Sequence, residues 1–420
     1  MTETKPFDIS KRLVWEAYKR VKANRGAAGV DQQSIAEFEL SLAGNLYRIW
    51  NRMSSGSYFP PPVSAVAIPK KSGGERILGV PTVSDRIAQT VATLVLNPLV
   101  EPHFHEDSYG YRAGKSAHQA LEVTRKRCWK YDWVLEYDIR GLFDNIDHGL
   151  LLKALRHHTD NKWVLLYVER WLTAPMQKRD GSLTSREVGC PQGGPLSPVL
   201  SNLFLHYALD HWLATRHKGI PFCRYADDGI ILCRTRKQAV YLHQQIADRL
   251  KECGLENHPE KTRIVYCKDA KRTGDDENIQ FDFLGFTFRP RKAMNKFGSL
   301  FLSFLPAPSN SALKTMRQTI RRWHLPLKSS WSLSDLARQF SPVIRGWMSY
   351  YCHFRQSAFQ SMAFHLDRAL ARWATRKFKR MRAHIKRAGK LIRKLSQRHP
   401  GLFPHWRLSS TYVAGSMGAR

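Results

Sequence analysis

Two adjacent acidic residues, Asp227 and Asp228, stand between two apolar runs in residues 222–232 and are the strongest candidates for chemistry. Adjacent carboxylates raise each other's pKa, so fold stability alone does not favour such a pair. A divalent cation removes that cost, and Asp138, which ends another apolar run, is the expected third ligand. Three carboxylates on neighbouring strands can hold two Mg²⁺ ions for in-line phosphoryl transfer to a nucleic-acid primer. The alternative is an ordinary polar turn.

Strands and tight turns are needed to position these carboxylates. The apolar runs around Asp227 predict a β-hairpin, and residues 133–139 predict the strand that carries Asp138. Residues 63–81 predict a second hairpin, with a Ser-Gly-Gly turn and cations on both arms. Helices are expected from Ser34 toward Tyr47, from Thr82 to about Asn97 with a stop at Pro98, from about Val199 to His217, from Lys237 to Cys253, from Asn310 to Trp323 and from Leu333 to Tyr351.

The charge of the chain is strongly positive. It has 67 Lys and Arg against 35 Asp and Glu, which gives a net charge of +32. Such an excess predicts binding to a polyanion, with nucleic acid ahead of an anionic membrane surface. No run of about 18 apolar residues occurs, so no membrane partner is expected, and the first ten residues do not resemble a secretory signal. Seven scattered cysteines favour free thiols in a reducing cytoplasm.

Residues 225–228, Tyr-Ala-Asp-Asp, resemble the active-site box of reverse transcriptases, and further motifs narrow the resemblance to the group II intron-encoded type. The resemblance extends from about Arg20 to about Trp373. It implies an α+β fold: a right-hand polymerase whose fingers and palm carry the carboxylates on an antiparallel sheet, followed by an α-helical thumb. It also implies two Mg²⁺ ions, with Mn²⁺ as a substitute. The metal ligands would be Asp138, Asp227, Asp228 and the carbonyl of Ile139.

The residues expected to hold the incoming nucleotide come from separate motifs of this resemblance. They are Lys70, Arg76, Ile139, Phe143, Gln192 and Lys261. Lys70 and Arg76 lie on opposite arms of a hairpin, so both can reach one anion. In group II intron-encoded reverse transcriptases, which this sequence resembles, such a pair holds the triphosphate of the incoming nucleotide. Lys71 is an alternative to Lys70.

Phe143 is the candidate that selects the sugar. An aromatic ring five residues after Asp138 packs beneath the sugar, leaves no room for a 2′-hydroxyl and therefore favours dNTPs. The alternative is a core phenylalanine. By the resemblance, Gln192 lines the nucleotide pocket and Lys261 is a candidate proton donor to pyrophosphate, with a solvated lysine as the alternative.

Residues in four regions are expected to bind nucleic acid. They are Arg20, Lys22 and Arg25 in an N-terminal loop, Gly285 in a hairpin that resembles the primer grip, Arg345 in a maturase signature, and Arg376, Lys379, Lys386 and Lys390 in a basic helix. That helix is expected over residues 371–398, where twelve Lys or Arg occur without an Asp or Glu. Its apolar residues recur at steps of four and three and predict one continuous seam. Aromatic residues at 347, 350, 351 and 354 are more typical of a core than of a base-stacking surface.

The resemblance also predicts domains and partners. The expected domains are residues 1–62 as an N-terminal extension and start of the fingers, 63–290 as fingers and palm, 291–370 as thumb or maturase domain, and 371–420 as a basic helix and tail with a possible DNA-binding role. The palm–thumb boundary is expected in a connector at residues 289–299. The expected partners are group II intron RNA, an RNA template with a DNA primer, a DNA target and dNTPs, in the bacterial cytoplasm near the nucleoid. Monomer and dimer both stay open, and no HNH endonuclease motif is visible.

The expected function is RNA-directed DNA synthesis combined with assistance to intron splicing and with retrohoming by target-primed reverse transcription. One alternative is a free-standing reverse transcriptase in DNA repair or phage defence, which uses the same chemistry. Another is an RNA-binding maturase that acts only in splicing. The complete carboxylate set and Phe143 argue against the second alternative.

Overall fold

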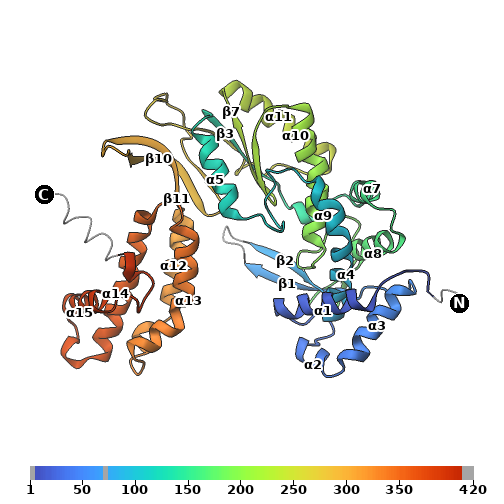
Figure 1. Ribbon diagram of the computed structural model, residues 1–420, viewed down its shortest axis with the longest axis horizontal. Helices are drawn as coiled ribbons and strands as arrows, with labels where there is room; N and C mark the ends of the chain where they lie inside the picture. The colour runs from blue at the N-terminus through green and yellow to red at the C-terminus, as the bar shows by residue number, and fades with distance from the viewer. Residues whose placement is uncertain (1–4, 70–73, 409–420) are drawn as a thin grey trace. The chain divides into compact units, whose positions relative to one another are not determined.

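The computed structural model describes residues 5–69 and 74–408 and contains both sheets and many helices (Figure 1). By its internal contacts the chain divides into two compact units. The first unit comprises Met1–Ser116 and Val134–Ile264, and the second comprises Ala117–Trp133 and Val265–Arg420. Each unit is therefore built from two separate stretches of the sequence.

The central sheet of the first unit carries the Asp227–Asp228 pair. Its strands are β6 (Phe222–Tyr225), β7 (Asp228–Cys233), β3 (Trp133–Asp138) and β8 (Arg263–Tyr266), in the order β6-β7-β3-β8. β6 and β7 pair antiparallel, so the predicted hairpin is confirmed. Both strands are largely buried, and helix α11 (Arg236–Glu252) packs against β7 (Figure 1). Burial on both faces fixes the strand register, because a slip of one residue would turn every side chain to the opposite face.

A second sheet of the first unit contains the other predicted hairpin. Its strands are β2 (Glu75–Val80), β1 (Val63–Pro69), β4 (Met176–Gln177) and β5 (Leu183–Thr184), in the order β2-β1-β4-β5. In the hairpin, Ile68 of β1 lies opposite Arg76 of β2. Lys70 and Lys71, which the sequence assigns to the nucleotide site, lie outside the described residues.

Helices surround these sheets in the first unit. They are α1 (Lys11–Asn24), α2 (Ile35–Glu39), α3 (Leu42–Ser54), α4 (Val83–Val100), α6 (Leu142–Asn145), α7 (His148–His158), α8 (Lys162–Thr173), α9 (Ser197–Leu205), α10 (His211–Arg216) and α11, with a 3₁₀ turn at Glu101–His103 and a π-helical turn at His206–Asp210. Ser34 forms the predicted capping box with Glu37, but the expected helix toward Tyr47 is two helices, α2 and α3. The expected stop at Pro98 is wrong, since α4 continues to Val100. A proline in the last turn removes one hydrogen bond, and the extensive burial of α4 tolerates that loss.

The sheet of the second unit is a long antiparallel structure (Figure 1). β9 (Phe281–Phe283), β10 (Phe286–Met294) and β11 (Leu300–Pro308) lie in the order β11-β10-β9. The connector expected at residues 289–299 is wrong, because residues 289–294 continue β10 and pair with β11. The expected boundary between residues 290 and 291 therefore falls inside a strand. The polar and glycine residues that suggested a connector are concentrated in the turn between β10 and β11.

Helices form the rest of the second unit. They are α5 (Ala117–Cys128), α12 (Asn310–Arg322), α13 (Leu333–Tyr351), α14 (Gln360–Lys377) and α15 (Ile385–Arg398), with 3₁₀ turns at Leu325–Leu327, Gln356–Phe359 and Lys379–Met381. α12 and α13 match the prediction closely. Trp347 stacks on Trp323 at 5.7 Å between ring centroids, and Tyr350 and Tyr351 both contact Phe286. The aromatic stripe is thus part of the packing, which confirms the core interpretation, and Phe354 at its end also lines a pocket.

The single basic helix expected over residues 371–398 is wrong. α14 ends at Lys377, a 3₁₀ turn follows, and α15 begins only at Ile385. Ala383 between them lies at φ 65°, a left-handed conformation that no helix interior contains. The predicted seam is interrupted at this break, where Phe378 and Ile385 are 40% and 41% exposed. Ala374, Ala388 and Ile392 remain buried because α15 packs against α14.

Two expectations from composition concern cysteines and membranes. None of the seven cysteines, all of which lie in the described residues, forms a disulfide, as their scattered spacing predicts. Within the described part of the chain, no helix has the length and apolar character needed to cross a bilayer.

Candidate active site

The Asp227–Asp228 pair lies at the turn between β6 and β7, and its backbone conformation is unusual. Ala226 occupies the left-handed region at φ 57°, which residues with a β-carbon rarely adopt. Gly110 packs so closely on the turn that a β-carbon at this position would lie 2.4 Å from the Ala226 nitrogen. The surrounding structure therefore holds the two carboxylates in an uncommon backbone geometry.

A buried arginine, Arg224, stabilises this turn by a hydrogen bond to its backbone. The side chain of Arg224 is 0% exposed, and its Nε and Nη2 donate to the two oxygens of Asp210 at 2.7 and 2.5 Å. Its Nη1 donates to the Ala226 carbonyl at 3.0 Å and to Asn202 Oδ1 at 3.2 Å, while Nη2 also donates to Ser108 Oγ at 2.8 Å. A guanidinium presents its donors in a fixed plane. Arg224 thus ties the carboxylate turn to a π-helical turn and to a neighbouring loop.

Sequence reasoning missed Arg224 and Asp210. The available signal was a charged residue inside the otherwise apolar start of β6, Phe222-Cys223-Arg224. A charge in such a strand is almost never fully buried unless it is paired. The partner itself, 14 residues earlier in the chain, carried no comparable signal.

Asp138 lies beside the pair, and Lys261 contacts it. Lys261 Nζ donates to Asp138 Oδ2 at 2.8 Å. Burial lowers the pKa of Lys261. The hydrogen bond with Asp138 and the charges of all three aspartates outweigh this effect and raise the pKa above its usual value. Burial, and then the charge of Asp138, raises the pKa of Asp227. Partial burial of the carboxyl, the charges of Asp227 and Asp138, and a hydrogen bond with Asp138 raise the pKa of Asp228 to about 7.

The raised pKa values of Asp227 and Asp228 reflect burial and also a negative charge of the three aspartates that the positive charge of Lys261 does not fully balance. The residues of the described chain contain no group of three or more His, Cys, Asp or Glu side chains already arranged to hold a metal ion. Neighbouring carboxylates repel, and the ammonium group of Lys261, which lies against Asp138, offsets part of this negative charge. Ile139 follows Asp138 at the end of β3 and forms a backbone bridge with Asn257.

The backbone carbonyls of Phe143 and Gln192 both accept hydrogen bonds from residues distant in the sequence. Phe143 in α6 is 8% exposed, and its carbonyl accepts from the Cys190 N–H at 2.6 Å. The carbonyl of Gln192 accepts from the Gly79 N–H at 2.9 Å, which ties this loop to β2. The side-chain Oε1 of Gln192 is buried without a hydrogen-bond partner among the described residues. An unsatisfied buried acceptor is costly, so Gln192 is available for a ligand.

Tyr111 is a third residue that sequence reasoning missed. Burial is the largest cause that raises the pKa of its hydroxyl, the charge of Asp227 adds to the increase, and Arg76 opposes it. The side chain of Tyr111 therefore shares an electrostatic environment with the carboxylates and with the predicted triphosphate ligand Arg76. Tyr111 also has a positive φ of 59°, a backbone feature that the sequence does not reveal.

Comparison with known proteins decides the family. Residues 68–288, more than half of the 420-residue chain, match the family model described as reverse transcriptase (RNA-dependent DNA polymerase). The chain belongs to the reverse transcriptase family. The protein is thus an RNA-directed DNA polymerase, a class that uses divalent metal ions. Residues 313–390 of this reverse transcriptase match the group II intron maturase-specific domain.

Several curated proteins resemble this reverse transcriptase. Protein YkfC of Escherichia coli (strain K12) is 28% identical over 296 residues, which cover 61% of this chain and 77% of YkfC. The group II intron-encoded protein LtrA of Lactococcus lactis subsp. cremoris is 30% identical over 197 residues, 46% of this chain and 32% of LtrA. The putative COX1/OXI3 intron 1 protein of Saccharomyces cerevisiae is 28% identical over 199 residues, 47% of this chain and 23% of that protein. The matches thus span less than a third of the two intron-encoded relatives.

The N-terminal cations of the reverse transcriptase are not in a loop as expected. Arg20 and Lys22 lie in α1, and Arg25 ends that helix in the left-handed conformation. All three side chains are exposed, but Lys22 Nζ pairs with a carboxylate oxygen of Glu39 at 2.8 Å. Only part of this positive charge is therefore uncompensated within the chain.

The predicted nucleic-acid ligands of the second unit are accessible. Exposed side chains are found at Arg345, Arg376, Lys379, Lys386 and Lys390. Gly285 lies at φ 79° in the turn between β9 and β10, where a β-carbon would come within 3.1 Å of the Tyr351 hydroxyl. The positive φ and the close Tyr351 hydroxyl explain why a residue without a side chain occupies this position.

Proposed function

We propose that this reverse transcriptase extends a DNA primer with dNTPs on an RNA template and also binds a group II intron RNA to assist its splicing. One observation supports the polymerase half: the charges of Asp138, Asp227 and Asp228 act on one another beside one turn, inside the region that matches the family. The proposed architecture is a right-hand polymerase, with fingers and palm over about residues 63–290 and a helical thumb and maturase domain over about residues 291–370.

The three carboxylates would hold two Mg²⁺ ions, or Mn²⁺ in their place. Asp138, Asp227 and Asp228, together with the Ile139 carbonyl, would hold these ions. The chemistry of these donors suits the ions, because Mg²⁺ prefers carboxylate oxygens and its charge would relieve the repulsion that adds to the raised pKa of Asp227 and Asp228. When bound, the ions supply the charge that lowers the pKa of the primer 3′-hydroxyl and stabilises pyrophosphate as it leaves.

The remaining residues of the site would bind and orient the nucleotide. Arg76 would hold the triphosphate together with Lys70, and the unsatisfied oxygen of Gln192 would accept a hydrogen bond from the nucleotide. Lys261, which lies 2.8 Å from Asp138, can turn toward the pyrophosphate and donate a proton to it. Phe143 would lie beneath the sugar and exclude a 2′-hydroxyl.

Replacing Phe143 with Val should let the enzyme accept ribonucleotides. The smaller side chain opens space beneath the sugar, so the preference for dNTP over rNTP should fall by at least about tenfold. The measurement is the ratio of kcat/KM values for single addition of a dNTP and the matching rNTP. The core alternative for Phe143 predicts an unchanged ratio.

A matched substitution at another buried phenylalanine separates an effect on dNTP selectivity from an effect on the free energy of unfolding. Phe38 is also buried, at 0% exposure, but it packs on Tyr18 in the N-terminal helices. Phe38→Val should lower the free energy of unfolding without changing the dNTP/rNTP ratio. If both variants change the ratio equally, Phe143 does not select the sugar.

The maturase half of the proposal rests on exposed positive charge in the matched maturase-specific region and near it. Ala383–Arg387 and Lys390 line a hollow of about 710 Å³ at the break between α14 and α15. Phosphate groups are the natural ligands of such a surface, and they provide affinity without reading base sequence. RNA shape, including its 2′-hydroxyls, would then determine which RNA is held.

Reversing the charge of this surface should weaken RNA binding before it affects polymerisation. The variant replaces Arg376, Lys379, Lys386 and Lys390 with Glu. Each lost phosphate contact removes about 0.7–0.9 from the slope of log affinity against log salt, so the slope should flatten by about 3 and affinity at low salt should fall by several orders of magnitude. The palm carboxylates are unchanged, so nucleotide addition at saturating primer–template should persist. The measurements are salt-dependent RNA binding and splicing of the cognate intron.

A control variant with the same change of net charge tests whether the loss of RNA binding comes from these four positions or from total charge. Lys153, Lys218, Lys237 and Lys251 are exposed cations of the first unit, and replacing them with Glu gives the same total charge. The control should retain most of the slope and splicing activity. Normal splicing by the first variant would contradict the assignment of the maturase surface.

We further propose that the protein supports retrohoming of its intron by target-primed reverse transcription in the bacterial cytoplasm, near the nucleoid. A DNA target would supply the primer, and the intron RNA would serve as the template. This proposal depends on both halves above, since the RNA must be held and also copied.

A further inference from the structure

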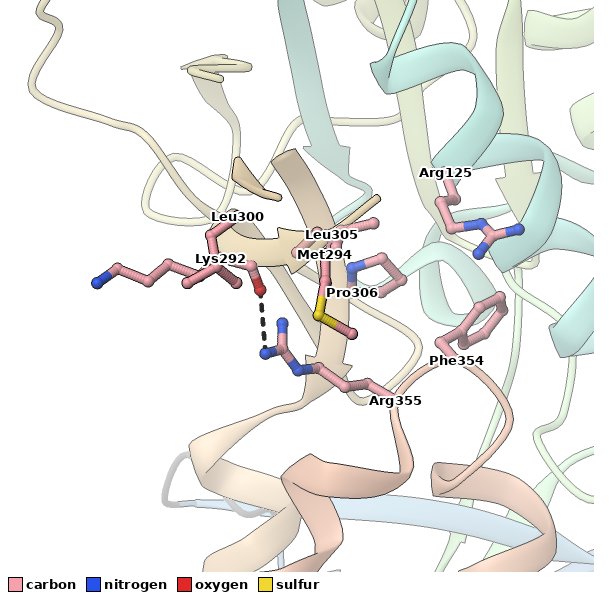
Figure 2. Close-up of a pocket in the computed structure, with 9 residues that line it drawn as sticks. Arg125, Lys292, Met294, Leu300, Leu305, Pro306, Phe354 and Arg355 are labelled. Carbon is pink, nitrogen blue, oxygen red and sulfur yellow. Dashed lines mark hydrogen bonds between the residues drawn. The ribbon is translucent and has the colours of Figure 1, made fainter. Parts of the chain in front are cut away.

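A pocket in the second unit is lined by none of the residues assigned above to catalysis or to nucleic-acid binding. The β10–β11 hairpin forms one wall, with Met294, Leu300 and Leu305, while Arg125 of α5 and Phe354 lie across from it (Figure 2). Its cavity volume is about 350 Å³. Ligand pockets usually measure about 300–1,000 Å³, so the space suits one small planar group.

Arginines stand on two sides of this pocket. Arg355 donates from Nη2 to the Lys292 carbonyl at 3.2 Å, which fixes its guanidinium against β10 (Figure 2). Arg125 lies with its guanidinium carbon 5.6 Å from the centre of the Phe354 ring. Its Nε is buried without a hydrogen-bond partner among the described residues, an arrangement that a bound acceptor would relieve.

The charged side chains that line the pocket are all cations, and one of them, Arg125, also pairs with Glu122 at 2.7 Å. Among the described residues that line it, Arg125, Lys292 and Arg355 are cationic and none is acidic. Burial, followed by the charges of Arg289 and Arg355, lowers the pKa of the adjacent Arg291 to about 10. Cations that crowd one another in this way attract an anion.

The apolar part of the pocket is unusually accessible. Met294 and Leu300 face each other across the hairpin, and each is 70% exposed. Phe297, at the turn of the same hairpin, is 80% exposed. Exposed apolar and aromatic side chains next to arginines are the combination that binds single-stranded nucleic acid, because bases stack on the apolar groups and phosphates contact the cations.

We propose that this pocket binds one unpaired nucleotide of a single-stranded RNA, with its base against Phe354, Met294 and Leu300 and its phosphate on Arg125 and Arg355. A duplex keeps its bases inside the stack, so only an unpaired base can enter a pocket of this size. The pocket shares no lining residue with the palm carboxylates or with the basic surface on α14 and α15. It would hold a loop or a free end of the RNA.

Photo-crosslinking tests this assignment without any nucleotide addition. The probe is a ten-nucleotide unstructured RNA that contains one 4-thiouridine, and crosslinked peptides are identified by mass spectrometry. We expect crosslinks in residues 290–306 or 353–355. Phe354→Leu, which removes the aromatic face, and Arg355→Met, which removes the phosphate ligand, should each lower this crosslink about 5- to 100-fold. Unlabelled single strand should compete, and the same sequence as a duplex should compete poorly.

Matched substitutions elsewhere in the second unit serve as controls. Phe364→Leu and Arg338→Met change the same residue types at exposed positions of α14 and α13 and should leave the crosslink unchanged. Leu300→Ser changes a 70% exposed side chain, so it should weaken the crosslink without lowering the thermal midpoint. It thus tests the pocket even if Phe354→Leu unfolds the protein.

Three results would overturn the proposal. A crosslink that persists in all three pocket variants would show that the RNA lies elsewhere, and equal competition by duplex would show a general phosphate surface. A change in sedimentation of the Leu300→Ser variant, with RNA crosslinking unaffected, would show that the hairpin contacts another copy of this protein. None of these results bears on the polymerase proposal, since no dNTP or Mg²⁺ is used.

Discussion

Replacing Asp227 with Asn should reduce primer extension to below about one per cent of wild type. The substitution keeps the size of the side chain but removes a charge that the proposed metal ions require. The same change should leave the thermal midpoint of the metal-free protein unchanged or raise it. Burial and the charge of Asp138 raise the pKa of Asp227, so its ionised form costs folding free energy. A loss of activity together with retained stability is therefore expected.

The control for this variant is another aspartate in a turn. Asp180 accepts hydrogen bonds from Ser182 and lies outside the site, so Asp180→Asn should polymerise normally. RNA binding by Asp227→Asn should also match wild type, because phosphate contacts lie elsewhere. Activity of Asp227→Asn above a few per cent of wild type would exclude Asp227 as an essential metal ligand.

Replacing Arg224 with Met should have the second largest effect, although Arg224 is a positioning residue. The substitution leaves Asp210 buried without its cation, which should lower the free energy of unfolding by about 3–5 kcal/mol. It also removes the donor that holds the Ala226 carbonyl beside the carboxylates. A displacement of about 1 Å can cost about 100-fold in rate, and we expect a loss of that order. The Mg²⁺ concentration for half-maximal rate should rise as well.

A double variant separates stability from positioning. Arg224→Met combined with Asp210→Leu replaces the buried ion pair by apolar side chains, which should recover most of the free energy of unfolding. The hydrogen bond to the Ala226 carbonyl is still missing, so the rate and the Mg²⁺ requirement should stay close to those of Arg224→Met. Recovery of both rate and stability would mean that Arg224 only stabilises the fold.

The sequence predicted the hairpin of Asp227, the strand of Asp138 and helices α12 and α13 well, because each combines a strong apolar period with a clear turn or cap. It failed where tertiary packing outweighs local signals. Ala383 interrupts the basic helix, and pairing with β11 converts the expected connector into part of β10. In both places the local composition was typical of the wrong element.

The candidate site shows the same limit. The carboxylates could be recognised because adjacent acids have no role in folding, whereas the residues that position them could not. Arg224 reaches Ser108 across 116 residues, and Tyr111 joins the site only through the folded chain. Such long-range contacts leave no spacing that a single sequence can reveal.

Template-directed addition of a single dNTP tests the central claim most directly. The purified protein is mixed with a DNA primer and four RNA templates that differ only in the first templating base, with one dNTP at a time and Mg²⁺. We expect the added nucleotide to follow the template base in all four cases and chelation of Mg²⁺ to stop the addition. Failure to extend on any RNA template, or extension that ignores the template base or persists after chelation, would contradict it.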